Sequence, residues 1–260
     1  MSGQPISLEG ARILVSNDDG IDAPGIKVLE QIARSLSDDV WVVAPEANKS
    51  GAGHSLTLQR PLRIRQIDER HFAVDGTPTD CVLLAVNEIL KDRAPTLVLS
   101  GINAGYNLGE DVRYSGTIAA AMEAVVLGVQ AIALSQYFKA ELEDPWQTPL
   151  GHAESIIRKL CAVGWPRDVV MSLNFPPVAP EAVKGVQATS QGRNKIGDEI
   201  QHGKDPRGKP YYWVGAMQLA SSSAEGTDRH AVEAGYVSVT PVSLDATHYD
   251  TLAQLRETLS

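Results

Sequence analysis

The chain has 260 residues, of which 43% are hydrophobic, and it carries 23 basic against 32 acidic side chains, a formal charge of −9. This length and hydrophobic content allow one large α/β domain with a substantial core. The negative charge disfavours bulk electrostatic binding to nucleic acid or to anionic membranes, so we expect neither partner. An anionic small substrate would need local neutralisation by a metal ion, backbone amides or a few cations.

The cysteine content and the hydropathy pattern bear on where the protein works. Cys81 and Cys161 lie far apart in the sequence, which predicts neither a disulfide framework nor a zinc site with C-x-x-C spacing. The N-terminus lacks a signal-peptide pattern, and the most apolar run, residues 118–134, is interrupted by Glu123 and Gln130. We therefore expect a cytoplasmic protein without a membrane span.

Short apolar runs alternate with helical patterns along the chain. The predicted strands cover residues 12–16, 40–44, 96–100, 131–135 and 169–173. One helix is expected to begin at Pro24, another to run from the Thr77 start signal to Leu90, and a third to cover residues 118–127. The apolar face of the first helix is formed by Ile26, Leu29, Ile32, Ala33 and Leu36. Continuous apolar strands between helices predict a mostly parallel sheet covered on both faces, in a Rossmann-like three-layer α/β core.

Two segments depart from this pattern. Residues 59–74 alternate in polarity, which predicts an antiparallel β-hairpin inserted between parallel elements. Residues 187–227 are polar and rich in Gly, Lys and Arg around a strand-like run at 210–219. We interpret them as a protruding C-terminal arm, serving as a lid, an oligomerisation element or a flexible insertion. The whole chain, residues 1–260, is expected to be one domain that carries this arm.

Polar side chains follow three of the predicted strands. The first strand leads into residues 16–20 (SNDDG), the second into 45–51 (PEANKSG) and the third into 101–105 (GINAG). In an open α/β sheet, ligands bind beyond the carboxyl ends of the strands. We therefore expect these three loops to form one site.

Adjacent carboxylates are the most distinctive feature of these loops. Asp18 and Asp19 repel each other unless a cation lies beside them, and Ser50 and Asn103 add further hard oxygen ligands of the kind that magnesium and manganese prefer. We assign these four residues to one divalent metal ion per subunit, magnesium or manganese. Taken alone, the aspartate pair equally fits a turn or a helix cap, and Ser50 or Asn103 alone fits an ordinary loop. Their arrival on three successive loops favours the metal.

A phosphate site is expected beside the metal. Ser115, Gly116 and Thr117 stand just before the third predicted helix, where free backbone N–H groups and the helix dipole favour an anion. Asn107 in the preceding loop is assigned to the same pocket. For an isolated Ser-Gly-Thr, an ordinary helix cap would be the favoured interpretation.

The expected chemistry is phosphate-ester hydrolysis with Asp18 and Asp19 as catalytic residues. A bound divalent ion lowers the pKa of a water molecule that attacks phosphorus, and either carboxylate can accept its proton. Direct attack by an aspartate is the alternative, but adjacent carboxylates do not match the Asp-x-Asp spacing of aspartyl-phosphate phosphatases. The sequence leaves open which aspartate binds the metal and which is the base.

Three other functions compete with this one. A dinucleotide-binding oxidoreductase would need G-x-G-x-x-G in the first βα turn, which instead carries two negative charges. A serine hydrolase using Ser50 and His54 lacks a G-x-S-x-G elbow. A non-catalytic nucleotide sensor would keep the same loops, although cations would serve binding better than two carboxylates. Release of inorganic phosphate separates it from an enzyme.

The ordered set of motifs resembles one known family, the SurE survival-protein phosphatases, which are 5'-nucleotidases acting on nucleoside monophosphates. The matching segments are ILVSNDDGIDAPGI at 13–26, VVAPEANKSGAGHSLTL at 42–58, VDGTPTDCV at 74–82, SGINAGYNLGEDVRYSGT at 100–117, NFP at 174–176 and GYVSVTP at 235–241. The resemblance implies a Rossmann-like core and a divalent metal held by Asp18, Asp19, Ser50 and Asn103. It also implies removal of phosphate from nucleotides, in some members from short polyphosphate, and a homodimer or homotetramer in which the C-terminal arm is exchanged.

Overall fold

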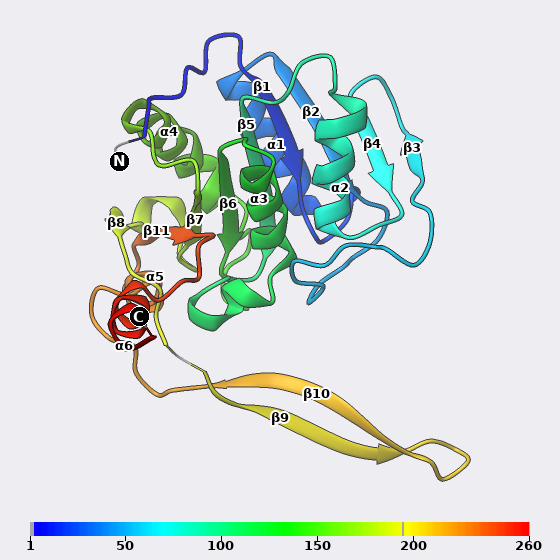
Figure 1. The fold of residues 1–260 in the computed structure, drawn as a ribbon, viewed down its shortest axis with the longest axis vertical. Coiled ribbons are helices and arrows are strands. Elements are labelled where there is room, and N and C mark those ends of the chain that lie inside the picture. Colours follow the sequence, from blue (N-terminus) through cyan, green and yellow to red (C-terminus); the bar gives the residue numbers. More distant parts are fainter. Residues whose placement is uncertain (1–2, 194, 260) are drawn as a thin grey trace.

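The fold is described from a computed structural model, which describes residues 3–193 and 195–259. In this part of the chain, the main sheet has nine strands in the order β3-β4-β2-β1-β5-β6-β7-β11-β8 (Figure 1). Its strands are β1 (Arg12–Ser16), β2 (Asp39–Pro45), β3 (Ile64–Gln66), β4 (His71–Val74), β5 (Leu97–Ala104), β6 (Ala131–Gln136), β7 (Val169–Phe175), β8 (Val186–Ala188) and β11 (Val237–Ser243).

The sheet is parallel through its centre and antiparallel near both edges. Strands β4, β2, β1, β5, β6 and β7 are parallel to one another, whereas β11 runs antiparallel to β7 and β3 antiparallel to β4. All five predicted strands are confirmed, with small shifts at their ends. The predicted hairpin forms at β3 and β4, but it begins at Ile64 rather than at residue 59, and β4 joins the parallel sheet.

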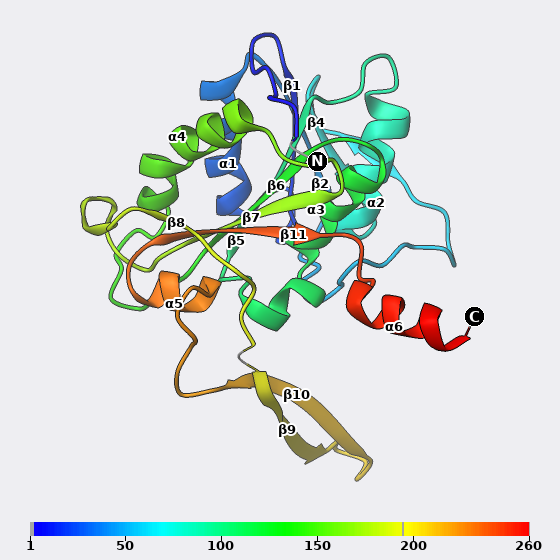
Figure 2. The same cartoon turned by 60° about the vertical axis from the view of Figure 1, so that its left-hand side comes forward.

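Helices cover both faces of the sheet. They are α1 (Pro24–Leu36), α2 (Pro78–Leu84), α3 (Gly116–Val126), α4 (Gln147–Val163), α5 (Asp228–Glu233) and α6 (Tyr249–Leu259), with a π-helical turn at Ala85–Ile89 and 3₁₀ turns at Gly109–Arg113 (η2) and Pro180–Ala182. Figure 2 shows α1 and α4 on one side of the sheet and α2 and α3 on the other. Because side chains alternate along a strand, Ile13 and Val15 of β1 pack with α1 and α4, whereas Leu14 packs with α2 and α3. The predicted three-layer core is therefore confirmed.

Two helix starts follow directly from the sequence. Helix α1 begins at Pro24, whose ring fixes a helical φ and whose missing N–H is not needed there. Helix α2 begins with a capping box, in which the Thr77 hydroxyl accepts from the Asp80 N–H at 3.1 Å and the Asp80 carboxylate accepts from the Thr77 N–H at 2.8 Å. Each of these helices begins after the carboxyl end of a strand, so the loop that precedes it lies at the edge of the sheet where the site is expected.

The arm is a two-stranded antiparallel ribbon of β9 (Lys195–Lys204) and β10 (Pro210–Leu219). It projects away from the main sheet at the bottom of Figures 1 and 2. Asn194, which falls within the predicted arm, lies outside the described residues. Along β10, Tyr212, Trp213 and Val214 are exposed, Trp213 by 66% of its surface. No helix in the described part of the chain is both long and apolar enough to cross a membrane.

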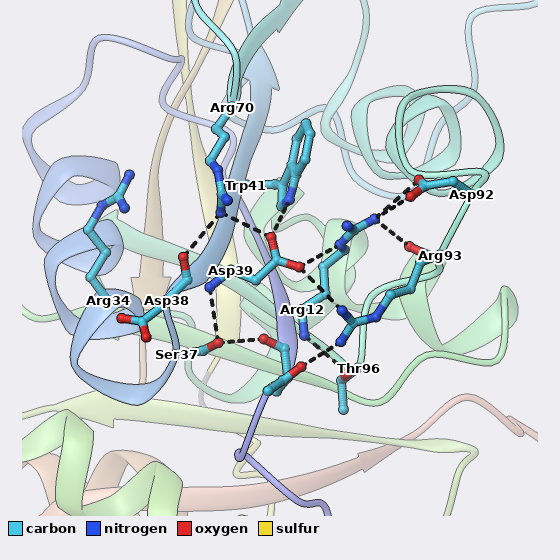
Figure 3. A network of polar contacts seen from close by, with 12 residues as sticks. Arg12, Arg34, Ser37, Asp38, Asp39, Trp41, Arg70, Asp92, Arg93 and Thr96 are labelled. Carbon is cyan, nitrogen blue, oxygen red and sulfur yellow. Dashed lines mark hydrogen bonds and ion pairs between the residues drawn. The ribbon is translucent and has the colours of Figure 1, made fainter.

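The amino edge of the sheet is held by a charged network centred on Asp39 (Figure 3). The Asp39 carboxylate accepts from Arg12 Nε at 2.8 Å, from Trp41 Nε1 at 2.8 Å and from Arg70 Nη1 at 3.0 Å. The guanidinium groups of Arg12 and Arg70 lie 5.3 and 5.6 Å from the Trp41 ring centroid. This network joins the starts of β1 and β2 at the edge opposite the candidate site.

Candidate active site

The turn after β1, the loop after β2 and the end of β5 meet at the carboxyl edge of the sheet. The sequence predicts this meeting, but it places residues 101–104 in a loop, whereas they belong to β5. The backbone N–H of Lys49, after β2, donates to the Asp18 carbonyl at 2.7 Å. The N–H of Ala104, at the end of β5, donates to the Asp19 carboxylate at 3.1 Å, and the Asn48 amide lies 3.5 Å from the other Asp19 oxygen. The turn of residues 17–20, which we call the aspartate turn, is therefore in direct contact with both of the other segments.

A side-chain clamp shapes the aspartate turn. The Asn17 amide donates to the Gly20 carbonyl at 2.9 Å, and the Gly20 N–H donates back to Asn17 Oδ1 at 3.2 Å. Gly20 has φ 104°, a conformation that side chains other than glycine rarely adopt. This closed turn fixes Asp18 and Asp19 between its ends, and Asn17 is a buried site residue that the sequence interpretation did not assign.

Asp18 points inward and lies against the start of α3. Its side chain is only 3% exposed and accepts a hydrogen bond from the Thr117 hydroxyl. A Cβ on Gly116 would stand 2.6 Å from the Asp18 Cβ, so only glycine allows this approach. Burial raises the pKa of Asp18; the hydrogen bond from Thr117 opposes that rise, and the negative charge of Asp19 adds to it. The carboxylate is thus held firmly, with no side-chain cation to compensate it among its described contacts.

The predicted phosphate site, residues 115–117, lies at the start of α3 and beside Asp18; we call these residues the phosphate turn. The Ser115 hydroxyl caps the helix by accepting from the Ile118 N–H at 3.1 Å, and the Thr117 carbonyl accepts from the Ser100 hydroxyl at 2.7 Å. The helix N-terminus therefore stands beside Asp18. Backbone N–H groups at such a position stabilise an anion, such as a phosphoryl group, and that of Gly116 also lowers the pKa of Asp18.

Asn103 and Ser50 differ in how well they are placed. The Asn103 amide donates to the Gly105 carbonyl at 3.0 Å, which leaves its side-chain oxygen without a hydrogen-bond donor in the described part of the chain. Ser50 is exposed; its backbone N–H donates to Asn48 Oδ1 at 2.8 Å, and within the same residues its hydroxyl contacts neither aspartate. The Asn103 oxygen is thus available to a ligand, whereas Ser50 is linked to the site through Asn48.

The donor set suits a hard divalent cation. Two carboxylates and an amide oxygen, completed by water, are ligands that magnesium and manganese accept. Among the residues the structure describes, no group of three or more His, Cys, Asp and Glu is arranged to hold a metal. A zinc-type cluster is accordingly not part of this site, and the fit rests on Asp18, Asp19 and Asn103.

Asn107 has a different environment from the one expected for a phosphate ligand. Its side-chain amide donates to the Ser135 hydroxyl at 2.8 Å, and its backbone N–H donates to Asn174 Oδ1 at 2.8 Å. The Asn174 amide donates back to the Asn107 carbonyl at 3.2 Å. These bonds tie Asn107 to the ends of β6 and β7, so its side chain supports the loop that leads to the phosphate turn.

Sequence reasoning did not assign two other buried groups near the site. Glu123 of α3 lies 3.0 Å from the His54 ring nitrogen, which joins the loop after Ser50 to the helix. Asp228, 2% exposed at the start of α5, accepts from the Gly109 N–H at 2.8 Å. Asp228 is far from the site in sequence, and no motif in the sequence analysis pointed to it.

The chain resembles known proteins over nearly its whole length. The family model described as Survival protein SurE matches residues 13–198. The chain is 57% identical to the 5'-nucleotidase SurE of Paramagnetospirillum magneticum over 94% of both chains, and 52% identical to that of Rhodospirillum rubrum over 95% of this chain and 96% of the relative. The crystal structure of the SurE protein from Aquifex aeolicus superposes with a TM-score of 0.83, at 41% identity over 96% of this chain and 100% of that one. With these matches and the shared fold, the chain belongs to the SurE family.

Proposed function

We propose that the protein is a metal-dependent phosphatase that hydrolyses nucleoside 5'-monophosphates to nucleoside and phosphate. The observation that carries the proposal is the buried Asp18 carboxylate, uncompensated by any described side-chain cation and packed against the N-terminus of α3. A cation-binding group and an anion-binding group thus share one wall of the site. The relatives in Paramagnetospirillum magneticum and Rhodospirillum rubrum are named 5'-nucleotidases, which supports the nucleotide substrate.

In this proposal, different residues bind the metal, orient the phosphoryl group and accept a proton. When bound, a divalent cation would neutralise charge and acidify a water molecule at this site. Asp19, which is more exposed than Asp18, and the free oxygen of Asn103 would hold it, with Asp18 completing the set. The N–H groups at the start of α3 and the Ser115 hydroxyl orient the phosphoryl group. One of the two carboxylates accepts the proton of the attacking water.

The proposal is tested with a panel of substrates and metals. Inorganic phosphate release is measured for nucleoside monophosphates with purine and pyrimidine bases, for their deoxy forms and for short polyphosphate, each with magnesium, manganese or no divalent ion. We expect release from the monophosphates only with a divalent ion. Turnover of polyphosphate in the same panel would add a second substrate. A protein that releases no phosphate from any monophosphate under any metal condition would overturn the proposal.

The arm supports a further part of the proposal, a homodimer or homotetramer formed by exchange of arms. A ribbon of two strands is at best marginally stable in water alone, yet β10 exposes Tyr212, Trp213 and Val214 in a row. A second copy of the chain would cover them. Sedimentation should therefore show a dimer or larger species, and Trp213→Glu should shift it toward the monomer, whereas Val163→Glu, at an exposed apolar position on α4, should not.

We place the enzyme in the cytoplasm. Cys81 and Cys161 are both free and buried. Burial raises the pKa of the Cys161 thiol to about 11 and that of Cys81 well above its ordinary value, so both thiols are chemically inert. Cell fractionation tests the location, and recovery in a membrane or exported fraction would contradict it.

A further inference from the structure

One buried carboxylate outside the candidate active site joins three distant segments. Asp228, at the start of α5, is 2% exposed. One of its oxygens accepts from the Gly109 N–H at 2.8 Å, and the other accepts from the Gly192 N–H at 3.0 Å and from the N–H of Arg229 at 2.8 Å. Gly109 begins the η2 turn that precedes the phosphate turn, and Gly192 belongs to the root of the arm, which we define as residues 190–193 and 195.

Other bonds between the arm root and η2 reinforce this link. The Gln191 side-chain amide donates to the Gly109 carbonyl at 2.6 Å, so Gly109 is held through both its N–H and its carbonyl. The Lys195 N–H donates to the Glu110 carboxylate at 3.1 Å, and the Lys195 ammonium lies 5.0 Å from the centroid of the Tyr114 ring. The arm root therefore contacts the first two residues of η2, Gly109 and Glu110, and also Tyr114, which directly follows η2.

The η2 turn passes straight into the phosphate turn. The N–H groups of Tyr114 and Ser115 both donate to the Asp111 carbonyl, each at 2.9 Å, and Ser115 then caps α3. The chain from Gly109 to Ser115 is thus one hydrogen-bonded unit without a flexible linker. A displacement at Gly109 would be passed on to the N–H groups of Gly116 and Thr117, beside Asp18.

A carboxylate suits this junction better than its neutral isostere. Its two oxygens face N–H donors from separate segments, and an amide in its place would turn an NH₂ group against one of those donors. Burying an ionised group is costly unless hydrogen bonds satisfy it, and here backbone N–H groups from three segments do so. These hydrogen bonds offset the cost of burying the Asp228 carboxylate, and they join segments that are far apart in sequence.

We propose that Asp228 is a positioning residue of the phosphatase site, through which the arm root sets the placement of the phosphate turn. The inference rests on the proposed phosphatase function. It adds a link between the arm and the site: the ribbon that projects from the sheet begins at residues that hold the phosphate turn. A chain whose root is displaced would keep its aspartate pair and lose the alignment of the anion site.

The test compares Asp228→Asn with Asp39→Asn, which makes the same change at the opposite edge of the sheet. Misplacement of a reacting group by about 1 Å costs about 10²-fold in rate, so we expect kcat of Asp228→Asn to fall between about 10- and 100-fold. Its affinity for manganese should stay near that of the unaltered protein, because Asp18 and Asp19 lie in the turn after β1 and Asn103 lies in β5. Hydrogen exchange at residues 109–117 should be faster. Asp39→Asn should show none of these changes in its folded form.

A second variant keeps the test decisive. Gln191→Ala leaves the buried carboxylate in place and removes the other bond to Gly109, so it should slow turnover and speed exchange in the same segment to a smaller degree. If Asp228→Asn does not fold, Gln191→Ala decides by the same readouts. Unchanged kcat and unchanged exchange at residues 109–117 in a folded variant would overturn the inference, and so would an equal loss in Asp39→Asn. If the unaltered protein releases no phosphate, the proposed function fails, while the exchange measurement still shows whether Asp228 positions the turn.

Discussion

The two edges of the central sheet each carry buried or partly buried aspartates, and they treat these charges in opposite ways. At the amino edge, Asp39 accepts hydrogen bonds from two arginines and an indole (Figure 3). At the carboxyl edge, Asp18 has a hydroxyl as its side-chain partner and another aspartate as its neighbour. The Asp39 cluster contains its own cations, whereas Asp18 has no side-chain cation among its described contacts, and we propose that a bound divalent ion supplies the missing charge.

The pKa directions express the same contrast. Burial alone would raise the pKa of Asp39, but the bonds from Arg12 and Trp41 and the charges of Arg12 and Arg70 lower it below its ordinary value of 3.8. At Asp18, burial raises the pKa and Thr117 offsets only part of the rise. A carboxylate that is paired with cations stabilises the fold, whereas a buried unpaired one is typical of a functional site, and we propose that role for Asp18. The comparison predicts that equivalent changes at the two edges have different consequences.

The largest effect is expected on catalysis at the carboxyl edge. Asp18→Asn and Asp19→Asn should each lower phosphate release by about 100-fold or more, since loss of one preorganised electrostatic group at a reacting centre has effects of that size. Circular dichroism should show that both variants remain folded. Near-normal turnover in either purified variant would remove that carboxylate from the essential set.

The reverse outcome is expected at the amino edge. Asp39→Asn should lower the free energy of unfolding by roughly 1–3 kcal/mol, because it weakens hydrogen bonds to buried or partly buried cations, and should leave kcat unchanged. Because the folded pKa of Asp39 lies below 3.8, its contribution is present above that pH and is lost as the pH falls through the folded pKa. Urea unfolding at pH 7 and near pH 3 measures the loss of stability and its dependence on pH. An equal loss at the two pH values would show that charge is not the cause.

Stability should respond in the opposite direction at Asp18. A folded pKa above 3.8 means that the folded state binds the proton more tightly, so the free energy of unfolding falls as the pH rises from 3.8 through the folded pKa. Asp18→Asn removes this penalty and, without metal, should unfold at pH 7 no more easily than the unaltered protein. A loss of more than about 1 kcal/mol, the net value of an ordinary hydrogen bond, would show that the carboxylate stabilises the fold.

The smallest effect concerns a second compensated group. Burial alone would lower the pKa of His71, but its contacts with Asp68 at 2.8 Å and Glu30 at 3.1 Å raise it above 6.5. Its stabilising contribution is therefore present below pH 6.5 and is lost as the pH rises through the folded pKa. His71→Gln should cost about 0.5–1 kcal/mol at pH 5.5 and little at pH 8.5, by urea unfolding. A loss of stability in His71→Gln that does not depend on pH would show that packing, and not the charge of His71, is the cause.

The centre of the fold and the meeting of the three loops could be predicted because they depend on local patterns. Apolar runs fixed the parallel strands, Pro24 fixed the start of α1, and strand ends determined which loops meet. Strand β11 was missed because Ser238 and Thr240 interrupt its apolar pattern. In the structure both are buried and share hydrogen bonds with Thr189, each at 2.7 Å. Such a cluster is polar in sequence and internal in space.

The finer assignments at the site depend on tertiary contacts and were harder to predict. The Asn107 amide is engaged with Ser135, and Ser50 has no described contact with either aspartate. Asp228 reaches Gly109 across more than a hundred positions of sequence. Residue type and spacing identified which groups gather at the edge. Only the packed structure shows which of them are free to bind and which hold the others in place.

Direct measurement of cation binding tests the contrast between the two edges most sharply. Calorimetric titration of the metal-free protein with manganese should show one ion bound per chain. Asp18→Asn and Asp19→Asn should weaken this binding by at least about 10-fold, the lower end of the effect of losing a group that supports a metal site, and Asp39→Asn should leave it unchanged. Absence of manganese binding, or binding that both carboxyl-edge variants retain, would contradict the account.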